Sequence, residues 1–87
     1  MFHKIEKVKV VKLYVLEVTF EDGTIKFYDV SNLFDKWEIF KNFQNARGLF
    51  ELVKVDKGGY GISWNDEIDL SCNELWENGM LKMETAE

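Results

Sequence analysis

The chain has 87 residues, of which 46% are hydrophobic and 15% are aromatic, and this composition is typical of one globular domain. Its formal net charge is −5, which makes direct binding of nucleic acid unfavourable, because such proteins usually present a basic face. Charged residues interrupt every hydrophobic stretch, and none approaches the roughly 18 apolar residues of a membrane-spanning helix. We therefore expect no membrane insertion.

The chain has one cysteine, Cys72, and one histidine, His3. A single cysteine cannot form a disulfide within the chain, which suits a reducing compartment, and we expect a cytoplasmic protein. A cysteine nucleophile needs a base beside it, and a structural zinc site needs several Cys or His ligands. We therefore predict no catalytic, cofactor-binding or metal-binding residues, and no enzyme activity.

The segment IEKVKVV, residues 5–11, predicts a first strand, because Val8 and Val10 alternate with Lys7 and Lys9. Alternation places the valines on one face of the strand and the lysines on the other. We therefore expect the valine face to pack against the core and the lysine face to be solvated.

The next segment, YVLEVTFEDGTIKFYDV, predicts a β-hairpin. Apolar side chains alternate along its first half, and Asp22 and Gly23 then supply a turn, since both tolerate positive φ angles. A two-residue loop would pair Phe20 with Ile25, and apolar residues of the two strands would then meet on one face. The pattern and the turn predict the same register.

Residues 31–48, SNLFDKWEIFKNFQNARG, change to a helical period. Ser31 is the predicted N-cap, and Gly48 is the predicted terminator. One long helix and two short helices joined near Trp37 both fit the pattern. The apolar positions at helical spacing are Leu33, Phe34, Trp37 and Phe40.

A second hairpin is predicted where LFELVKVD and GYGISW flank the turn segment KGG. The glycines of KGGYG invite comparison with a phosphate-binding loop. Such a loop leads into a helix N-terminus, whereas a strand pattern follows here, so the hairpin interpretation is favoured.

The last predicted element is a short helix in SCNELWENG. Ser71 as N-cap and Glu74 three residues later form a capping-box sequence. Gly79 is predicted to end the helix in the left-handed conformation, and Leu75 and Trp76 are its predicted buried residues.

These elements predict an α+β fold with a small antiparallel sheet of about five strands and two or three short helices. We expect one domain over residues 1–87, with an ordered core at about residues 4–80 and a polar tail at residues 81–87.

The acids Asp66, Glu67 and Asp69 form the one cluster with some potential for chemistry, since paired carboxylates can transfer protons or hold a hard cation. The stretch lacks the central glycine and the ligand spacing of an EF-hand loop. Acids ahead of a helix also stabilise it without any function. The sequence therefore favours a solvated loop.

The aromatic residues are numerous for one small core, and any excess would form an exposed patch, which is the usual mark of a partner surface. The candidate interaction surface comprises Phe2, Tyr28 and Tyr60, together with the acids Asp66 and Glu67.

Three segments, VLEVTFEDGTIKFYDV, LFELVKV and GISWNDEIDLSCNELW, together resemble the bacterial family called domain of unknown function 2442 (DUF2442). Its members share a strand ending in F-x-D-G, an acidic residue before a short helical region, an F-x-x-V strand, and W-x-x-x-x-D-[LI] before a last helix. The resemblance covers residues 5–78. The matching positions are Phe20, Asp22, Gly23, Asp29, Phe50, Val53, Trp64, Asp69 and Leu70.

The resemblance implies a small α+β domain without catalytic residues to carry over. Some members have an added helix-turn-helix domain, and some are encoded beside another small protein, as in toxin–antitoxin or regulatory pairs. The resemblance therefore implies a function in association with another molecule.

Our first hypothesis is a non-enzymatic interaction module that binds a partner protein or a second copy of itself, and that serves as the acidic member of such a pair. One alternative is a metal-dependent or acid–base activity in the loop from Asp66 to Glu74. Another is an accessory subunit of a nucleic-acid regulator, and a purely structural subunit also remains open.

Overall fold

The computed structural model describes residues 2–82, which form two antiparallel sheets and several short helices. The predicted α+β class is confirmed. The strands are β1 (Ile5–Lys12), β2 (Val15–Phe20), β3 (Ile25–Asp29), β4 (Lys54–Val55), β5 (Gly61–Ser63), β6 (Asp69–Ser71) and β7 (Met80–Leu81). The α-helices are α1 (Asn42–Asn45) and α2 (Cys72–Asn78), and the 3-10 helices are η1 (Val30–Leu33), η2 (Glu38–Lys41), η3 (Phe50–Leu52) and η4 (Lys57–Gly59).

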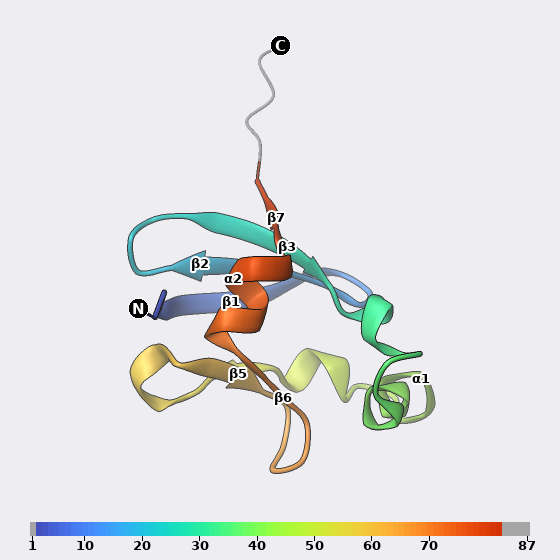
Figure 1. Cartoon of the computed structure of the whole chain (residues 1–87). Coiled ribbons are helices and arrows are strands. Elements are labelled where there is room, and N and C mark those ends of the chain that lie inside the picture. Colours follow the sequence, from blue (N-terminus) through green and yellow to red (C-terminus); the bar gives the residue numbers. More distant parts are fainter. Residues whose placement is uncertain (1, 83–87) are drawn as a thin grey trace.

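The strands divide into a larger sheet, in the order β1-β2-β3-β7, and a smaller one, in the order β4-β5-β6. Figure 1 shows the two sheets one above the other, with α2 running from the smaller sheet to the larger one. Strand β7 pairs with β3 directly after α2, so part of the segment expected to be a polar tail belongs to the larger sheet. Two-residue strands such as β4 and β7 are too short to show alternation in a sequence.

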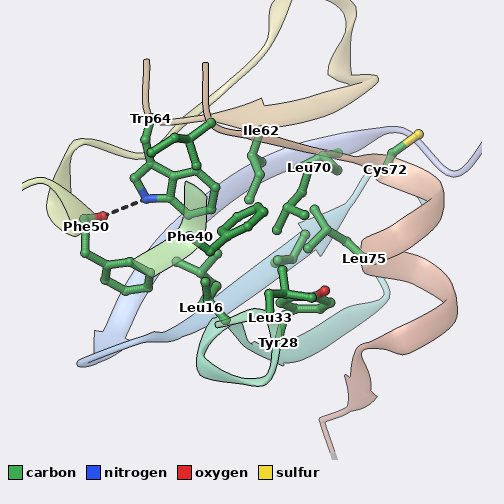
Figure 2. Close-up of a cluster of buried hydrophobic side chains, with 14 of the residues drawn as sticks. Leu16, Tyr28, Leu33, Phe40, Phe50, Ile62, Trp64, Leu70, Cys72 and Leu75 are labelled. Carbon is green, nitrogen blue, oxygen red and sulfur yellow. Dashed lines mark hydrogen bonds between the residues drawn. The ribbon is translucent and has the colours of Figure 1, made fainter. Parts of the chain in front are cut away.

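One hydrophobic cluster lies between the two sheets and is closed by α2 and the turns that follow β3 (Figure 2). Every fully buried side chain of the described residues is apolar. The core of this small chain therefore avoids the free-energy cost of burying polar side chains. The buried members are Ile5, Leu16, Val18, Phe20, Tyr28, Val30, Leu33, Phe40, Phe43, Phe50, Ile62, Trp64, Ile68, Leu70, Cys72 and Leu75.

The register of the first hairpin differs from the prediction by one residue. Ile25 lies opposite Thr19 and not opposite Phe20. The loop has three residues, since the Gly23 amide donates to the Phe20 carbonyl oxygen (2.9 Å) and Gly23 adopts φ +94°, a left-handed conformation that favours glycine. A one-residue shift turns every side chain of β3 to the other face, so Lys26 lies on the face that α2 covers.

The segment after β3 forms short turns separated at Trp37, in agreement with the alternative of short helices joined there. Trp37 is extended (φ −133°, ψ 118°), which interrupts the helical period between η1 and η2. The predicted N-cap, Ser31, is wrong. Asp29 caps η1 instead, because its carboxylate accepts a hydrogen bond from the Ser31 amide (3.0 Å).

Helix α2 begins at its predicted N-cap, although the Glu74 carboxylate accepts from the Tyr28 hydroxyl and not from the Ser71 amide as in a capping box, and it ends differently. Ser71 Oγ accepts a hydrogen bond from the Glu74 amide (3.1 Å), which confirms the N-cap. Gly79 is extended (φ −78°, ψ 156°), so the predicted left-handed conformation is wrong. Glycine is needed there for space, because a Cβ atom would lie 2.5 Å from the Leu75 carbonyl oxygen. Leu75 is fully buried, whereas Trp76 is only partly buried.

Trp64, which follows β5, connects the smaller sheet to η3 through its side chain. Its side chain is only 4% exposed, and its indole Nε1 donates to the Phe50 carbonyl oxygen (3.0 Å), as Figure 2 shows. The ring packs against those of Phe43 (4.8 Å between centroids) and Phe50 (5.9 Å). The hydrogen bond supplies the polar partner that a buried tryptophan requires.

We predict that Trp64→Phe lowers the free energy of unfolding by about 1–3 kcal/mol, because the Phe50 carbonyl oxygen loses its partner inside the core. The measurement is urea unfolding followed by circular dichroism. The matched control is Trp37→Phe, at a tryptophan that is 43% exposed, which should change stability by less than about 0.5 kcal/mol. Equal losses in the two variants would contradict the prediction.

Candidate functional site

The residues proposed from the sequence as an interaction surface do not form one surface. Phe2 and Tyr60 are exposed and pack edge to face, with ring centroids 5.3 Å apart. Asp66 and Glu67 are exposed in the connection between β5 and β6. Tyr28 is only 4% exposed, so the expectation that it contributes to an exposed patch is wrong. The one-residue register shift of β3 explains this, because it turns Tyr28 towards the core.

A cleft of about 600 Å³ opens between the turn at residues 36–40 and the junction of β6 with α2. We call it the acidic cleft. Its two walls come from segments about 30 residues apart in the sequence, which the fold brings together. The lining residues are Lys36, Trp37, Glu38, Ile39, Phe40, Glu67, Asp69, Leu70, Ser71 and Glu74.

The acidic cleft combines an exposed aromatic ring with an excess of negative charge. Among residues 2–82, four of the lining residues are carboxylates and one, Lys36, is a cation. The Lys36 ammonium lies 5.0 Å from the centroid of the Trp37 ring, which is a cation–π distance. Glu38 also pairs with Lys41 outside the lining, at 3.7 Å. The cleft therefore favours a positively charged ligand.

The wall that carries Trp37 is positioned by backbone hydrogen bonds. The Trp37 amide donates to the Leu33 carbonyl oxygen (3.0 Å), and the Phe40 amide donates to the Trp37 carbonyl oxygen (3.1 Å). Phe40 is buried in the core, so it anchors the turn while the Trp37 side chain stays at the surface. The helical pattern of this segment predicted Trp37 as an apolar contact, and only its extended backbone reveals its exposed position.

The opposite wall is positioned by Asn65. Its side-chain oxygen accepts hydrogen bonds from the amides of Glu67 (2.8 Å) and Ile68 (2.9 Å), which closes a tight turn. Ile68 is buried, and Glu67 and Asp69 on either side of it both line the cleft. Asp66 does not line it. The acidic run predicted from the sequence is thus divided between the cleft and other surface.

Glu74 connects the cleft to the core. Its carboxylate Oε2 accepts a hydrogen bond from the Tyr28 hydroxyl (2.7 Å). Burial raises the pKa of Tyr28, and the hydrogen bond and negative charge of Glu74 raise it further. The phenol is therefore a stable donor at neutral pH, and it orients the Glu74 carboxylate at the edge of the cleft. A second hollow of about 290 Å³ shares Lys36 and Glu74 with the cleft.

The remaining reactive side chains make structural contacts. Cys72 is buried, and His3 stacks flat on Trp76, with ring centroids 3.5 Å apart. Within residues 2–82, no three His, Cys, Asp or Glu side chains are grouped closely enough to hold a metal ion. The loop acids Asp66 and Glu67 are thus not part of such a group.

The solvent face of the larger sheet carries a charged cluster around Glu17 and the exposed side chain of Met80. Glu17 pairs with Lys9 (3.6 Å) and Lys82 (3.2 Å). Burial on its own would raise the pKa of Glu17, but the hydrogen bond from Lys82 and the two positive charges outweigh it, so the pKa is lowered. Met80 on β7 pairs with Phe27 on this face and is 75% exposed, whereas the neighbouring Leu81 (61% exposed) pairs with Lys26 and points to the opposite face. Sequence reasoning missed this face because no strand was predicted after Gly79.

These features define a small α+β protein with an acidic surface cleft beside its last helix. No helix among residues 2–82 is long and apolar enough to span a membrane. Residues 5–80 match the family described as "Protein of unknown function (DUF2442)", and the chain belongs to this family. The resemblance noted in the sequence is thereby confirmed. Comparison with curated proteins and with solved structures found no match.

The Tyr28–Glu74 contact predicts a pH dependence of stability. The unfolded chain releases the Tyr28 proton near the ordinary pKa of 10, whereas the folded chain retains it to higher pH. This contribution to stability is therefore fully present below pH 10 and is lost as the pH rises above it. Between pH 9 and pH 11 the wild type should lose about 1 kcal/mol more of its free energy of unfolding than Tyr28→Phe.

The measurement is urea unfolding at several pH values, with Tyr60→Phe as the control at an exposed tyrosine. The difference between wild type and Tyr28→Phe isolates one group from the other residues that titrate in this range. Parallel stability profiles for these two proteins would contradict the prediction.

Proposed function

We propose that this chain is a non-enzymatic interaction module that binds a positively charged segment of a partner protein in the acidic cleft. The observation that carries the proposal is the composition of the cleft, where exposed Trp37 lies among four carboxylates and a single cation. The net charge of −5 acts in the same direction over longer distances. In a two-component pair, this chain would be the acidic member and its partner the basic one.

A protein partner is favoured by the type of side chain that the cleft exposes. Tryptophan is enriched among residues that contribute strongly to protein–protein binding, because its large ring loses much water-exposed area on contact. The apolar side chains of Ile39 and Leu70 line the same cleft and suit the aliphatic part of a lysine or arginine. Phosphate groups of a nucleic acid would be repelled by the four carboxylates.

The acidic walls favour both the rate and the specificity of association. Complementary charge steers encounter and selects against acidic competitors more than it adds affinity, because each exposed ion pair contributes only about 0.2–1 kcal/mol. Contact with Trp37 therefore has to supply much of the affinity. We therefore expect replacement of Trp37 to reduce the affinity strongly, and replacement of a single acid to reduce it less.

We predict that a basic peptide of alternating lysine and arginine residues with glycine spacers binds the cleft. Titration followed by amide chemical shifts should move the signals of residues 36–40 and 67–74. Trp37→Ala should weaken binding at least about tenfold, since it removes the main aromatic contact. The matched control is Tyr60→Ala, at a tyrosine that is 48% exposed and does not line the cleft, and it should leave the affinity unchanged.

Two variants in the acidic run test how much negative charge contributes to peptide binding. Asp69→Asn removes a carboxylate that lines the cleft, whereas Asp66→Asn removes one that does not. The first change should weaken binding up to about fivefold and the second should have a smaller effect. If the peptide fails to bind at low ionic strength, or if Trp37→Ala and Tyr60→Ala weaken binding equally, the proposed function is wrong.

A further inference from the structure

We infer that the acidic cleft recognises arginine in particular, with the guanidinium group stacked on the Trp37 ring in place of the Lys36 ammonium. This inference rests on the proposed function and specifies the side chain that the partner inserts. It starts from the internal contact, in which the Lys36 Nζ atom lies 5.0 Å from the centroid of the Trp37 ring. The ring therefore already contacts a cation, and Lys36 marks the position that the guanidinium group would take.

Lys36 is held weakly enough to be displaced. Its side chain is exposed, and within residues 2–82 it makes no ion pair with a carboxylate at 4.0 Å or less. An exposed cation–π contact contributes only about 0.5–1 kcal/mol, so a ligand that makes this contact together with further hydrogen bonds can replace it. The Lys36 side chain can move into solvent because its stem is flexible.

The arrangement of hydrogen-bond acceptors favours arginine over lysine. Carboxylates lie on both walls of the cleft, with Glu38 on one side and Glu67, Asp69 and Glu74 on the other. A guanidinium group is planar and has five N–H donors, so it can stack on an indole ring while it donates to carboxylates at its edge. An ammonium group is a compact point charge that cannot stack. The cleft volume of about 600 Å³ leaves room for the group beside the ring.

Glu74 is the acceptor whose position is most firmly determined. The Tyr28 hydroxyl donates to its Oε2 atom (2.7 Å), and the Glu74 amide is held by Ser71 Oγ (3.1 Å). This leaves the remaining lone pairs of the carboxylate available to a ligand at the edge of the cleft. A carboxylate fixed before binding loses less side-chain freedom when the guanidinium group arrives.

The test uses two peptides of equal length and charge that differ only in having arginine or lysine at every basic position. We expect the arginine peptide to bind wild type at least about fivefold more tightly by isothermal titration calorimetry. In Trp37→Ala this preference should decrease at least about twofold, because stacking on the indole ring is lost and only the hydrogen bonds to the carboxylates remain. A comparable affinity of both peptides for wild type, or a preference of undiminished size in Trp37→Ala, would overturn the arginine inference while leaving the proposed function intact.

Lys36 supplies a second and independent readout. Lys36→Met keeps the apolar stem and removes the competing cation, so the arginine peptide should bind this variant about twofold to fivefold more tightly. Lys7→Met is the control for net charge, since Lys7 lies exposed on β1 and does not line the cleft. Equal effects of the two changes would show that Lys36 does not occupy the arginine position. Failure of both peptides to bind any variant would instead refute the proposed function itself.

Discussion

The hydrogen bond between the Tyr28 hydroxyl and the Glu74 carboxylate joins helix α2 to the larger sheet, and the arrangement of both sheets depends on this helix. At its start, the Cys72 amide donates to the carbonyl oxygen of Tyr60 (2.8 Å), the residue directly before β5 of the smaller sheet. At its far end, the Lys26 ammonium donates to the Trp76 carbonyl oxygen, and β7 then pairs with β3. A seven-residue helix thus spans the two sheets (Figure 1). Because such a short helix has little stability of its own, these tertiary contacts determine its position.

The acidic cleft is a consequence of the same arrangement. Leu75 is fully buried, which orients α2 so that Glu74, one residue earlier, comes to the edge of the core. The turn around Trp37 then meets the start of the helix because Leu33 and Phe40 on either side of it are buried in the same cluster. The core thus determines the spacing of the walls, and the charged side chains stand on a rigid support. A preformed cleft of this kind loses little entropy when a ligand binds.

The sequence predicted best the features that depend on neighbouring residues. The α+β class and the N-cap at Ser71 were visible as local patterns, and the interruption at Trp37 was one of two alternatives that fitted the pattern. The hairpin register was not, because Asp-Gly fits both a two-residue loop and the three-residue loop that Gly23 forms. The role of Gly79 was also mispredicted. Glycine is required there because the Leu75 carbonyl oxygen leaves no room for a Cβ atom, and not because the backbone adopts a positive φ angle. The cleft could not be predicted because segments about 30 residues apart form it.

The acidic run after β5 shows that position in the fold, and not charge, decides which acids line the cleft. Asp66 and Asp69 have the same side chain and lie three residues apart, yet only Asp69 lines the cleft. The turn closed by Asn65 buries Ile68 between them, so the chain reverses and Asp69 enters β6. The sequence alone does not distinguish the acids of such a run that line a cleft from those that do not. The fold places Glu67, Asp69 and Glu74 across the cleft from Trp37, and the combination of these acids with an aromatic ring is the basis on which we propose a cationic side chain as the ligand.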